Sequence, residues 1–260
     1  MNTIKFLGTA GARFVVMRQV RSSGGIWFQL DSTNFLVDPG PGSLVRCAAS
    51  RPRLDPSKLD AIILTHRHLD HSADANIMIE AMTEGGFTRK GGVFAPKDAL
   101  EDDPVILCYM RDKVERVEIL QENSHYSFGN ITFNTSPLLK HSVETYGLTF
   151  HTKDTSISLI PDTSYFEGLD TYFSADVLIV YVAFLHERPD LPHAKHLSLE
   201  DARRIIRNIN PKAAILTHFG MTMVKAKPWE LAQEMSAELG TRVLAANDGM
   251  TVNLEDISKA

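Results

Sequence analysis

The feature that most constrains this chain is a histidine-rich motif directly after a short apolar run. Residues 61–64 are all apolar, and three histidines and an aspartate follow within residues 66–71. The apolar run predicts a buried strand. A motif on the turn that leaves such a strand lies where open α/β sheets place their ligand crevices. The sequence therefore predicts an α/β fold with a site at the end of this strand.

The spacing within the motif suits metal binding. His66 and His68 are two residues apart, so in an extended turn both imidazoles project to one side and can reach one metal ion. Asp70 and His71 follow as the chain bends toward a predicted helix, and they could bind a second ion. Neutral imidazole and carboxylate are the ligands of catalytic zinc sites. A polar turn with exposed histidines is the plainer alternative, but so many ligand types at this spacing favour a metal site.

Three later residues are further candidate ligands, because each lies beside a strand-like run. His141 precedes the run 146–150, whereas Asp162 and His218 come at the ends of two other apolar runs. Taken singly, each could be an ordinary polar group of the surface or the core. As a set in register with the first motif, they predict convergence on one rim of a sheet.

The pattern His-x-His-x-Asp-His after a hydrophobic strand resembles the signature of the metallo-β-lactamase superfamily. The resemblance implies two metal sites that share one carboxylate: one of His66, His68 and His141, another of Asp70, His71 and His218, and a bridging Asp162. It also implies that Asp38, at the end of a predicted strand, supports the ligand loop by hydrogen bonds and does not bind metal. The implied cofactor is a pair of divalent ions, zinc by default, with manganese or iron also suited to these ligands.

Strand-like and helical segments alternate along the 260 residues, as in a large α/β unit. Strand-rich blocks at 3–38 and 116–160, each followed by helices, predict two sheets packed together with helices outside. A helix is expected at 73–84, where apolar residues recur at helical spacing. The resemblance implies the same architecture, a four-layer αββα sandwich of two mixed sheets, built as a single domain over residues 1–260 with internal pseudo-symmetry.

A loop at 184–197 carries His186, His193 and His196 ahead of a helix for which Ser198 is the predicted N-cap. In the ribonuclease Z-like phosphodiesterases of the superfamily, a histidine stands at the offset of His196, 22 positions (218 − 196) before the last ligand, and acts on the leaving group. The resemblance therefore implies a catalytic role for His196, beside Asp70. The alternative, a surface loop histidine, stays open.

Two departures from ribonuclease Z bear on the substrate. Ribonuclease Z carries His-Glu-x-Thr around its catalytic histidine, whereas this chain has His-Leu-Ser-Leu at 196–199. It also carries an insertion that clamps tRNA, but here the interval from His141 to Asp162 is only 21 residues (162 − 141). Structured tRNA is therefore an unlikely substrate on these motifs. A cyclic-phosphate phosphodiesterase of phosphonate breakdown has a similarly short interval and a similar Asp-Gly-Met, although its extra cysteine ligands are not matched here.

Three arginines, Arg13, Arg18 and Arg21, fall near the N-terminus in a predicted loop rich in serine and glycine. Their guanidinium groups could contact phosphate oxygens of a substrate. They could equally form a solvated face, and the sequence favours neither.

Composition narrows the class of partner. The formal net charge is −5, which disfavours a protein that lives on non-specific nucleic-acid contacts. Cys47 and Cys108 form no CxxC pair, so we expect free thiols in a reducing compartment. The chain shows neither a secretory signal pattern nor an apolar run long enough for a bilayer. We therefore expect a cytoplasmic protein without a membrane partner; its oligomeric state stays open, a homodimer included.

These features together predict a hydrolase with a dinuclear metal centre and a bridging hydroxide. We expect in-line attack on phosphorus in a small or cyclic phosphodiester, with a small molecule as the substrate. The same centre serves glyoxalase II-like and lactonase members of the superfamily, so a carboxyl ester, thioester or lactone hydrolase is the alternative. A non-catalytic binding module is disfavoured, because seven converging polar groups are costly to keep without metal.

Overall fold

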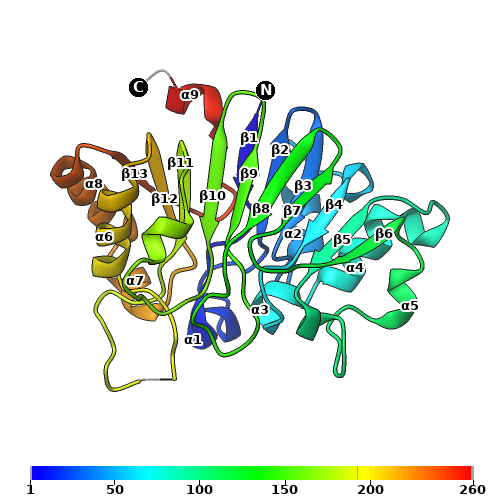
Figure 1. Ribbon diagram of the computed structural model, residues 1–260, viewed down its shortest axis with the longest axis horizontal. Coiled ribbons are helices and arrows are strands. Elements are labelled where there is room, and N and C mark those ends of the chain that lie inside the picture. The colour runs from blue at the N-terminus through cyan, green and yellow to red at the C-terminus, as the bar shows by residue number, and fades with distance from the viewer. Residues whose placement is uncertain (1, 192, 259–260) are drawn as a thin grey trace.

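The protein consists of two facing β-sheets with helices on their outer sides, as the computed structural model of residues 2–191 and 193–258 shows (Figure 1). From edge to edge, the first sheet contains β14 (Thr251–Asn253), β1 (Thr3–Phe6), β2 (Ile26–Leu30), β3 (Thr33–Val37), β4 (Ala61–Ile63), β5 (Gly92–Ala95) and β6 (Arg116–Ile119). The second contains β13 (Arg242–Ala245), β12 (Ala213–Thr217), β11 (Val177–Tyr181), β10 (Ser156–Ile160), β9 (Leu148–His151), β8 (Ile131–Thr135) and β7 (His125–Phe128). The predicted αββα architecture with two mixed sheets is confirmed.

The helices fall into three sets. The outer side of the first sheet packs against α2 (Ser43–Ala49), α4 (Ala75–Met82) and α5 (Cys108–Arg111). The outer side of the second sheet packs against α6 (Leu199–Ile209) and α8 (Pro228–Leu239). Three short helices lie along the lower edge in Figure 1: α1 (Ala12–Met17), α3 (Leu69–Ser72) and α7 (Met221–Lys225). The remaining helical turns are α9 (Leu254–Ser258) and four 3₁₀ turns, Pro56–Lys58, Glu84–Gly86, Lys97–Ala99 and Leu169–Tyr172.

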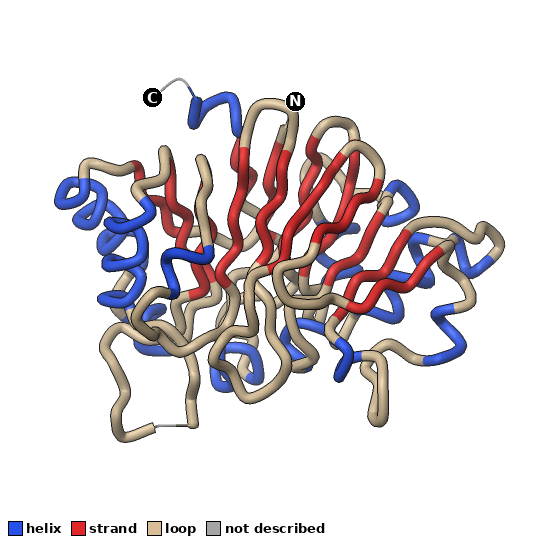
Figure 2. Tube along the Cα trace, in the orientation of Figure 1, coloured by secondary structure: helices blue, strands red, loops and turns tan. Residues whose placement is uncertain are grey.

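The two sheets are built alike. In the first, β14 to β3 pair antiparallel and β3 to β6 pair parallel. In the second, β7 to β10 pair antiparallel and β10 to β13 pair parallel. Parallel strands send their carboxyl ends to the same edge of a sheet, which is where ligand crevices form. Long loops gather along that edge, close to α1, α3 and α7, as Figure 2 shows.

Aromatic packing joins the sheets. Phe28 and Phe35 are paired across β2 and β3, and their rings stack with centroids 4.8 Å apart. Phe150 on β9 of the other sheet lies 4.8 Å from Phe35 and 5.3 Å from Phe28, ring centroid to ring centroid. All three side chains are fully buried. Aromatic pairs at this spacing add directional packing energy to the burial of apolar area, so this cluster fixes the separation of the sheets.

Several predicted elements are corrected by the structure. The sequence places the strand near 116–120 in the second strand-rich block, but β6 pairs parallel with β5 at the edge of the first sheet. The predicted helix 73–84 is the shorter α4, Ala75–Met82, and a separate short helix, α3, precedes it and contains Asp70 and His71. Arg13 lies in α1 and not in a loop. The helix boundaries differ because short elements carry too few periods for a sequence pattern to resolve, whereas the sheet that β6 joins depends on tertiary packing.

Other sequence-based expectations meet the structure as follows. The short strand β7 is not among the predicted strands; its four residues, HYSF, alternate between exposed and inward-facing side chains, but over too short a run to indicate a strand from the sequence. Cys47 is buried and Cys108 exposed, and both are free thiols.

No helix among the described residues has the length and apolar character needed to cross a bilayer. The expected unit 1–260 and the loop 184–197 include residues 1, 192, 259 and 260, which lie outside the described residues.

Candidate metal centre

The predicted ligands come from both sheets and meet at the edge that holds α1, α3 and α7. His66 and His68 lie on the turn after β4, and Asp70 and His71 lie in α3. His141 lies in the connection between β8 and β9, Asp162 follows β10, and His218 follows β12. The structure therefore brings together all seven side chains that the sequence singled out, in two groups of possible metal-binding residues.

The first group consists of His66, His68 and His141. One ring nitrogen of each lies within 4.8 Å of the others. Nε2 of His141 faces Nδ1 of His68 at 3.1 Å. His66 is fully buried, and its Nε2 has no hydrogen-bond partner among the described residues. A buried ring nitrogen without a partner points to a ligand, since such groups are otherwise paired.

The second group consists of Asp70, His71, Asp162 and His218. Nε2 of His71 lies 3.1 Å from Nε2 of His218, 3.4 Å from Oδ2 of Asp162 and 3.5 Å from Oδ2 of Asp70. Nδ1 of His218 lies 3.2 Å from Oδ1 of Asp162. Asp162 also approaches the first group, because its Oδ2 lies 3.8 Å from Nε2 of His66. Its carboxylate therefore lies within reach of both groups.

These spacings fit divalent metal ions. Two ligands bound to one tetrahedral zinc at its usual bond lengths are about 3.3 Å apart. The facing donor pairs His68–His141, His71–His218 and His71–Asp70, and the contacts of Asp162 with His71 and His66, lie 3.1–3.8 Å apart, and all donors of a group lie within 4.8 Å of one another. Paired ring nitrogens that face each other at 3.1 Å have no better partner than a shared cation. The donor set of imidazoles and carboxylates suits zinc, manganese or iron.

Hydrogen bonds on the far side of several rings orient the nitrogens that face the centre. Nδ1 of His71 lies 3.0 Å from Oδ2 of Asp38, so its Nε2 is directed inward. Nδ1 of His141 lies 2.9 Å from the carbonyl oxygen of Lys195, which likewise leaves Nε2 inward. Nδ1 of His66 lies 3.0 Å from Oγ1 of Thr65. Such outer partners fix the tautomer and the ring position of metal-binding histidines.

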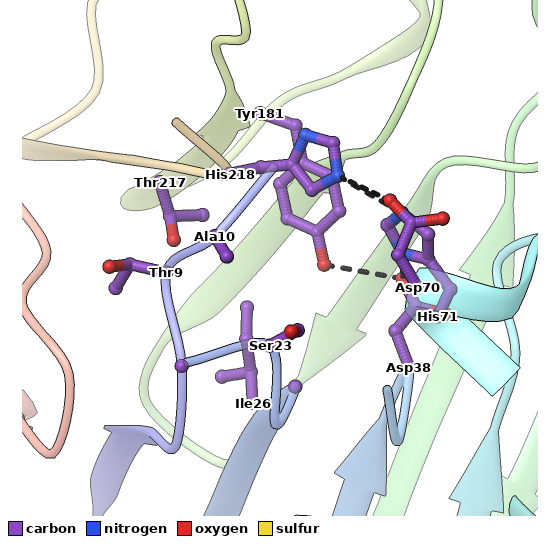
Figure 3. A pocket seen from close by; sticks show the side chains of 12 residues that line it. Thr9, Ala10, Ser23, Ile26, Asp38, Asp70, His71, Tyr181, Thr217 and His218 are labelled. Atoms are coloured by element: carbon purple, nitrogen blue, oxygen red, sulfur yellow. Dashed lines mark hydrogen bonds and ion pairs between the residues drawn. The ribbon is translucent and has the colours of Figure 1, made fainter. Parts of the chain in front are cut away.

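Asp38 ties the ligand loop to both sheets. Its Oδ1 accepts a hydrogen bond from the Thr65 backbone N–H at 2.7 Å, and its Oδ2 accepts one from Thr65 Oγ1 at 2.8 Å. The hydroxyl of Tyr181, on β11 of the second sheet, donates to the same Oδ2 at 3.2 Å (Figure 3). Although Asp38 lies near His66 and His71, both oxygens are occupied by these donors. This arrangement agrees with the supporting role expected for Asp38.

Sequence reasoning missed Tyr181. Its ring stacks on His218 with centroids 4.8 Å apart and planes 7° apart, and it lies 5.7 Å from the His71 ring. Burial and the nearby carboxylates of Asp38 and Asp162 raise its pKa well above the usual value, so it remains a neutral donor. The sequence does contain a signal for this role, namely a tyrosine in an otherwise apolar strand. A buried tyrosine hydroxyl needs a hydrogen-bond partner, so such a residue indicates a polar contact in the core.

The electrostatics of the centre favour a cation. Burial lowers the pKa of His66 and His68, and it lowers that of His141 to about 4, so these imidazoles are neutral. Burial alone would raise the pKa of Asp162, but the surrounding histidines, first His218 and His196, hold it well below its usual range. Burial likewise opposes the shift at His71, where the carboxylates of Asp70 and Asp38 raise the pKa well above normal. Positive charge is therefore stabilised between these carboxylates.

Backbone strain and close packing hold the loops in place. Asp38 and His218 adopt positive φ values, 54° and 60°, which are uncommon for residues with a side chain. A Cβ atom on Gly40 would overlap the carbonyl oxygens of Ser23 and Asp70, and one on Gly11 would overlap the His218 carbonyl. Only glycine therefore allows these segments to approach the ligand loops so closely.

His196 lies beside the two groups. Its Nε2 is 3.2 Å from Oδ2 of Asp162, and its ring packs edge-on against Phe184. Burial alone would lower its pKa, but the nearby carboxylates, first Asp162 and then Asp70, raise that pKa above its usual value. The predicted N-cap that follows is confirmed, since Ser198 and Asp201 form a capping box at the start of α6.

A groove of about 810 Å³ opens onto this centre. His68, Asp70, His141, Asp162 and His196 line one part of it. A much smaller cavity of about 20 Å³ lies behind, between His71, His218 and Tyr181 (Figure 3). A reactant would therefore reach the centre from the groove.

The three N-terminal arginines have different surroundings. Arg13 lines the groove. Arg18 lies over the Phe14 ring, with 6.0 Å between its guanidinium carbon and the ring centroid. Arg21 points into the protein, where it donates to Thr9 Oγ1 and to the Ala246 carbonyl. Of the three, Arg13 alone lines the groove next to the candidate ligands.

Comparison with known proteins gives consistent matches. A model of the β-lactamase superfamily domain matches residues 33–219. The chain is 28% identical to an uncharacterized protein of Methanocaldococcus jannaschii, over 96% of this chain and 94% of that protein. The structure of the metallo-β-lactamase fold protein YhfI from Bacillus subtilis superposes with a TM-score of 0.77 at 22% identity, covering 96% and 98% of the two chains. A diphosphatase of the PhnP family superposes with a TM-score of 0.72 at 18% identity, covering 97% and 98%.

Replacement of Asp38 by alanine tests its supporting role. The change leaves Thr65 and Tyr181 with buried donors and no acceptor, so we expect Asp38→Ala to lower the free energy of unfolding by about 3 kcal/mol or more. Urea unfolding of chelator-treated protein measures this without a contribution from metal. Asp154→Ala, at an exposed position, is the control and should change stability by less than about 0.5 kcal/mol. Equal effects of the two substitutions would contradict the role given to Asp38.

Proposed function

This chain belongs to the metallo-β-lactamase superfamily of metal-dependent hydrolases, and we propose that it is a dinuclear phosphodiesterase of small or cyclic phosphodiesters. The observation that carries the proposal is the position of Asp162 Oδ2. It lies 3.4 Å from His71 Nε2, 3.8 Å from His66 Nε2 and 3.2 Å from His196 Nε2. One carboxylate thus lies within 4 Å of ring nitrogens from both candidate metal groups and from His196, which lines the groove.

The proposed ligands follow the two groups. His66, His68 and His141 would hold one ion, and Asp70, His71 and His218 the other, with Asp162 shared between them. When bound, such ions supply an acidified water at neutral pH and neutralise charge on phosphoryl oxygens. Asp38, Thr65 and the Lys195 carbonyl keep the rings in position through their hydrogen bonds. Asp70 lines the groove, so its carboxylate also faces an entering phosphoryl group.

His196 is proposed as the proton donor to the leaving group. An alkoxide that departs from phosphorus needs a proton as the P–O bond breaks. His196 lines the groove, and its ring packs edge-on against Phe184, two residues before the capping box of α6 begins at Ser198. Its Nδ1 is buried without a hydrogen-bond partner among the described residues, whereas Nε2 lies beside Asp162. An imidazole held at the mouth of the centre can carry a proton to an oxygen in the groove.

The choice of phosphodiester rests on His196 and on the short interval between His141 and Asp162. Within that interval, the structure has β9 and β10 joined directly, with no added domain. A PhnP-family protein of the same fold is described as a diphosphatase, which is compatible with chemistry at phosphorus. Structured tRNA is not a proposed substrate, because this interval holds no separate clamp.

The metal content is the first test. We expect about two transition-metal ions per chain in protein purified without chelator, on the usual number of ligands per ion. Asp162→Ala should lower the content toward zero, because it removes the shared carboxylate. His125→Ala, an exposed histidine on β7, is the matched control and should keep both ions. Elemental analysis that finds no metal after supplementation with zinc or manganese would remove the proposed centre.

The reaction class is tested by a substrate panel on metal-loaded protein. We expect hydrolysis of bis(p-nitrophenyl) phosphate or of a nucleoside cyclic phosphate, and little cleavage of structured precursor tRNA. The panel includes homoserine lactones and glutathione thioesters, because the same ligand set serves hydrolases of carboxyl derivatives. Higher kcat/KM for either of these than for every phosphodiester would assign the protein to that class instead.

His196→Ala tests the proton donor. We expect kcat on an alkyl phosphodiester to fall by roughly 10²–10⁴ fold, the usual contribution of general acid catalysis. The loss should be small for a p-nitrophenyl ester, whose leaving group departs without a proton, and metal content should not change. His186→Ala, an exposed histidine of the same loop, should behave as the unchanged protein. Loss of metal from the His196 variant would identify this residue as a ligand.

A further inference from the structure

The groove at the centre has two chemically different parts. Candidate metal ligands and His196 line its inner part. Its outer part is lined by large apolar side chains from separate elements: Phe14 and Met17 of α1, Leu69 of α3, Phe184 after β11, and Met221 of α7. The polar and apolar walls belong to one continuous cavity, so a molecule bound at the centre extends over the apolar surface.

Helix α1 has apolar side chains on two faces, and only one of these faces packs against the protein. Its sequence, ARFVVM, buries Val15 against the protein. Phe14 and Met17 are three residues apart and lie on the other face, where they are 63% and 75% exposed. An amphipathic surface helix normally places polar side chains on that face. One apolar face of the helix therefore packs against the protein, and a second apolar face lines the groove.

Leu69 of α3 extends the apolar surface that Phe14 and Met17 of α1 form in the groove. It lies between the candidate ligands His68 and Asp70, and it is 70% exposed. Single exposed apolar residues are common, but a group of them around a cavity marks a place where an apolar ligand binds. On the other wall, the Phe184 ring packs edge-on against His196 with centroids 5.7 Å apart. Apolar surface thus reaches to the residue proposed to protonate the leaving group.

Charge in the groove suits a molecule with one anionic end. Arg13 stands on α1 beside Phe14, and its side chain lines the same groove. A second arginine of the groove wall, Arg188, is already paired with Asp190. Metal-binding groups at the inner end, with Arg13 and apolar side chains on the α1 wall, match an amphiphile that carries one anionic group.

From this arrangement we infer that the substrate is an amphiphilic phosphodiester, in which one ester group is an extended apolar chain that lies along α1 and Leu69. The inference rests on the proposed phosphodiesterase function, which places phosphorus at the centre. A short polar diester would leave Phe14, Met17 and Leu69 in water and would gain nothing from them. For each methylene group of the substrate that moves from water onto these side chains, the binding constant rises by up to about fourfold.

The test uses p-nitrophenyl phosphodiesters whose second ester is methyl, butyl or octyl, each below its self-association concentration. We expect kcat/KM to rise by at least about tenfold from methyl to octyl. The double substitution Phe14→Ser with Leu69→Ser should reduce the octyl-to-methyl ratio by about fivefold or more. Phe87→Ser is the control, because Phe87 is 95% exposed but does not line the groove, and it should keep the ratio.

A binding measurement separates this inference from the proposed function. Isothermal titration calorimetry with octyl phosphate and methyl phosphate needs no turnover. Tighter binding of octyl phosphate that depends on Phe14 and Leu69 supports the groove even if no diester is hydrolysed, in which case the proposed reaction alone is wrong. Turnover and binding that are equal for methyl and octyl compounds overturn the inference and leave the phosphodiesterase proposal standing. A shift from dimer to monomer in the Phe14 and Leu69 variant, with no effect of chain length, would assign this surface to a second copy of the chain and overturn it as well.

Discussion

The buried carboxylate of Asp162 is the group on which the arrangement of the site depends. It is almost without solvent contact, and it lies within 4 Å of ring nitrogens from His66, His71, His196 and His218. A buried charge is tolerated only where opposite charge or hydrogen bonds compensate it. The turn after β4, helix α3, the turn after β12 and the loop before α6 all supply that compensation. The loops of both sheets are therefore positioned by one electrostatic requirement.

This requirement can be met only if the sheets keep a fixed separation. In the core, the stacked rings of Phe28 and Phe35 pack against the tilted ring of Phe150 from the other sheet and help to set that separation. Near the site, the hydrogen bond from Tyr181 to Asp38 joins β11 of one sheet to the end of β3 of the other. The aromatic packing in the core and the Tyr181–Asp38 hydrogen bond near the site therefore both constrain the distance between the two sheets. A well-packed interior transmits small displacements, so changes in the core are felt at the ligands.

The groove adds a second type of chemistry to the same edge. The inner part is polar and its donors are oriented by outer hydrogen bonds, whereas α1 and Leu69 present apolar surface that the fold does not use for its own core. A fold of this family fixes the reaction centre, and the loops and short helices around it select the substrate. The short helix α1 is such an element, because it carries Arg13, Phe14 and Met17 to the groove on one turn and a half of chain.

The sequence by itself determined the candidate ligands and the general architecture. His66, His68, Asp70 and His71 are recognisable because their spacing is local, and the apolar runs before Asp162 and His218 have the pattern of buried strands. The capping box at Ser198 is likewise a pattern of four neighbouring residues. Such features depend on residues a few positions apart, which is the range that periodicity and capping rules describe.

Only the tertiary structure decided which nitrogen of each histidine faces the centre, which sheet takes β6, and what surrounds the reactant. The contact between His68 and His141 joins residues 73 positions apart, and the one between Tyr181 and Asp38 joins residues 143 apart. The exposure of Phe14 and Met17 is also decided by the tertiary structure. From the sequence alone, an apolar residue in a short helix would be assigned to the core. Contacts between distant segments are set by how whole sheets and loops pack together, and a local pattern does not contain that information.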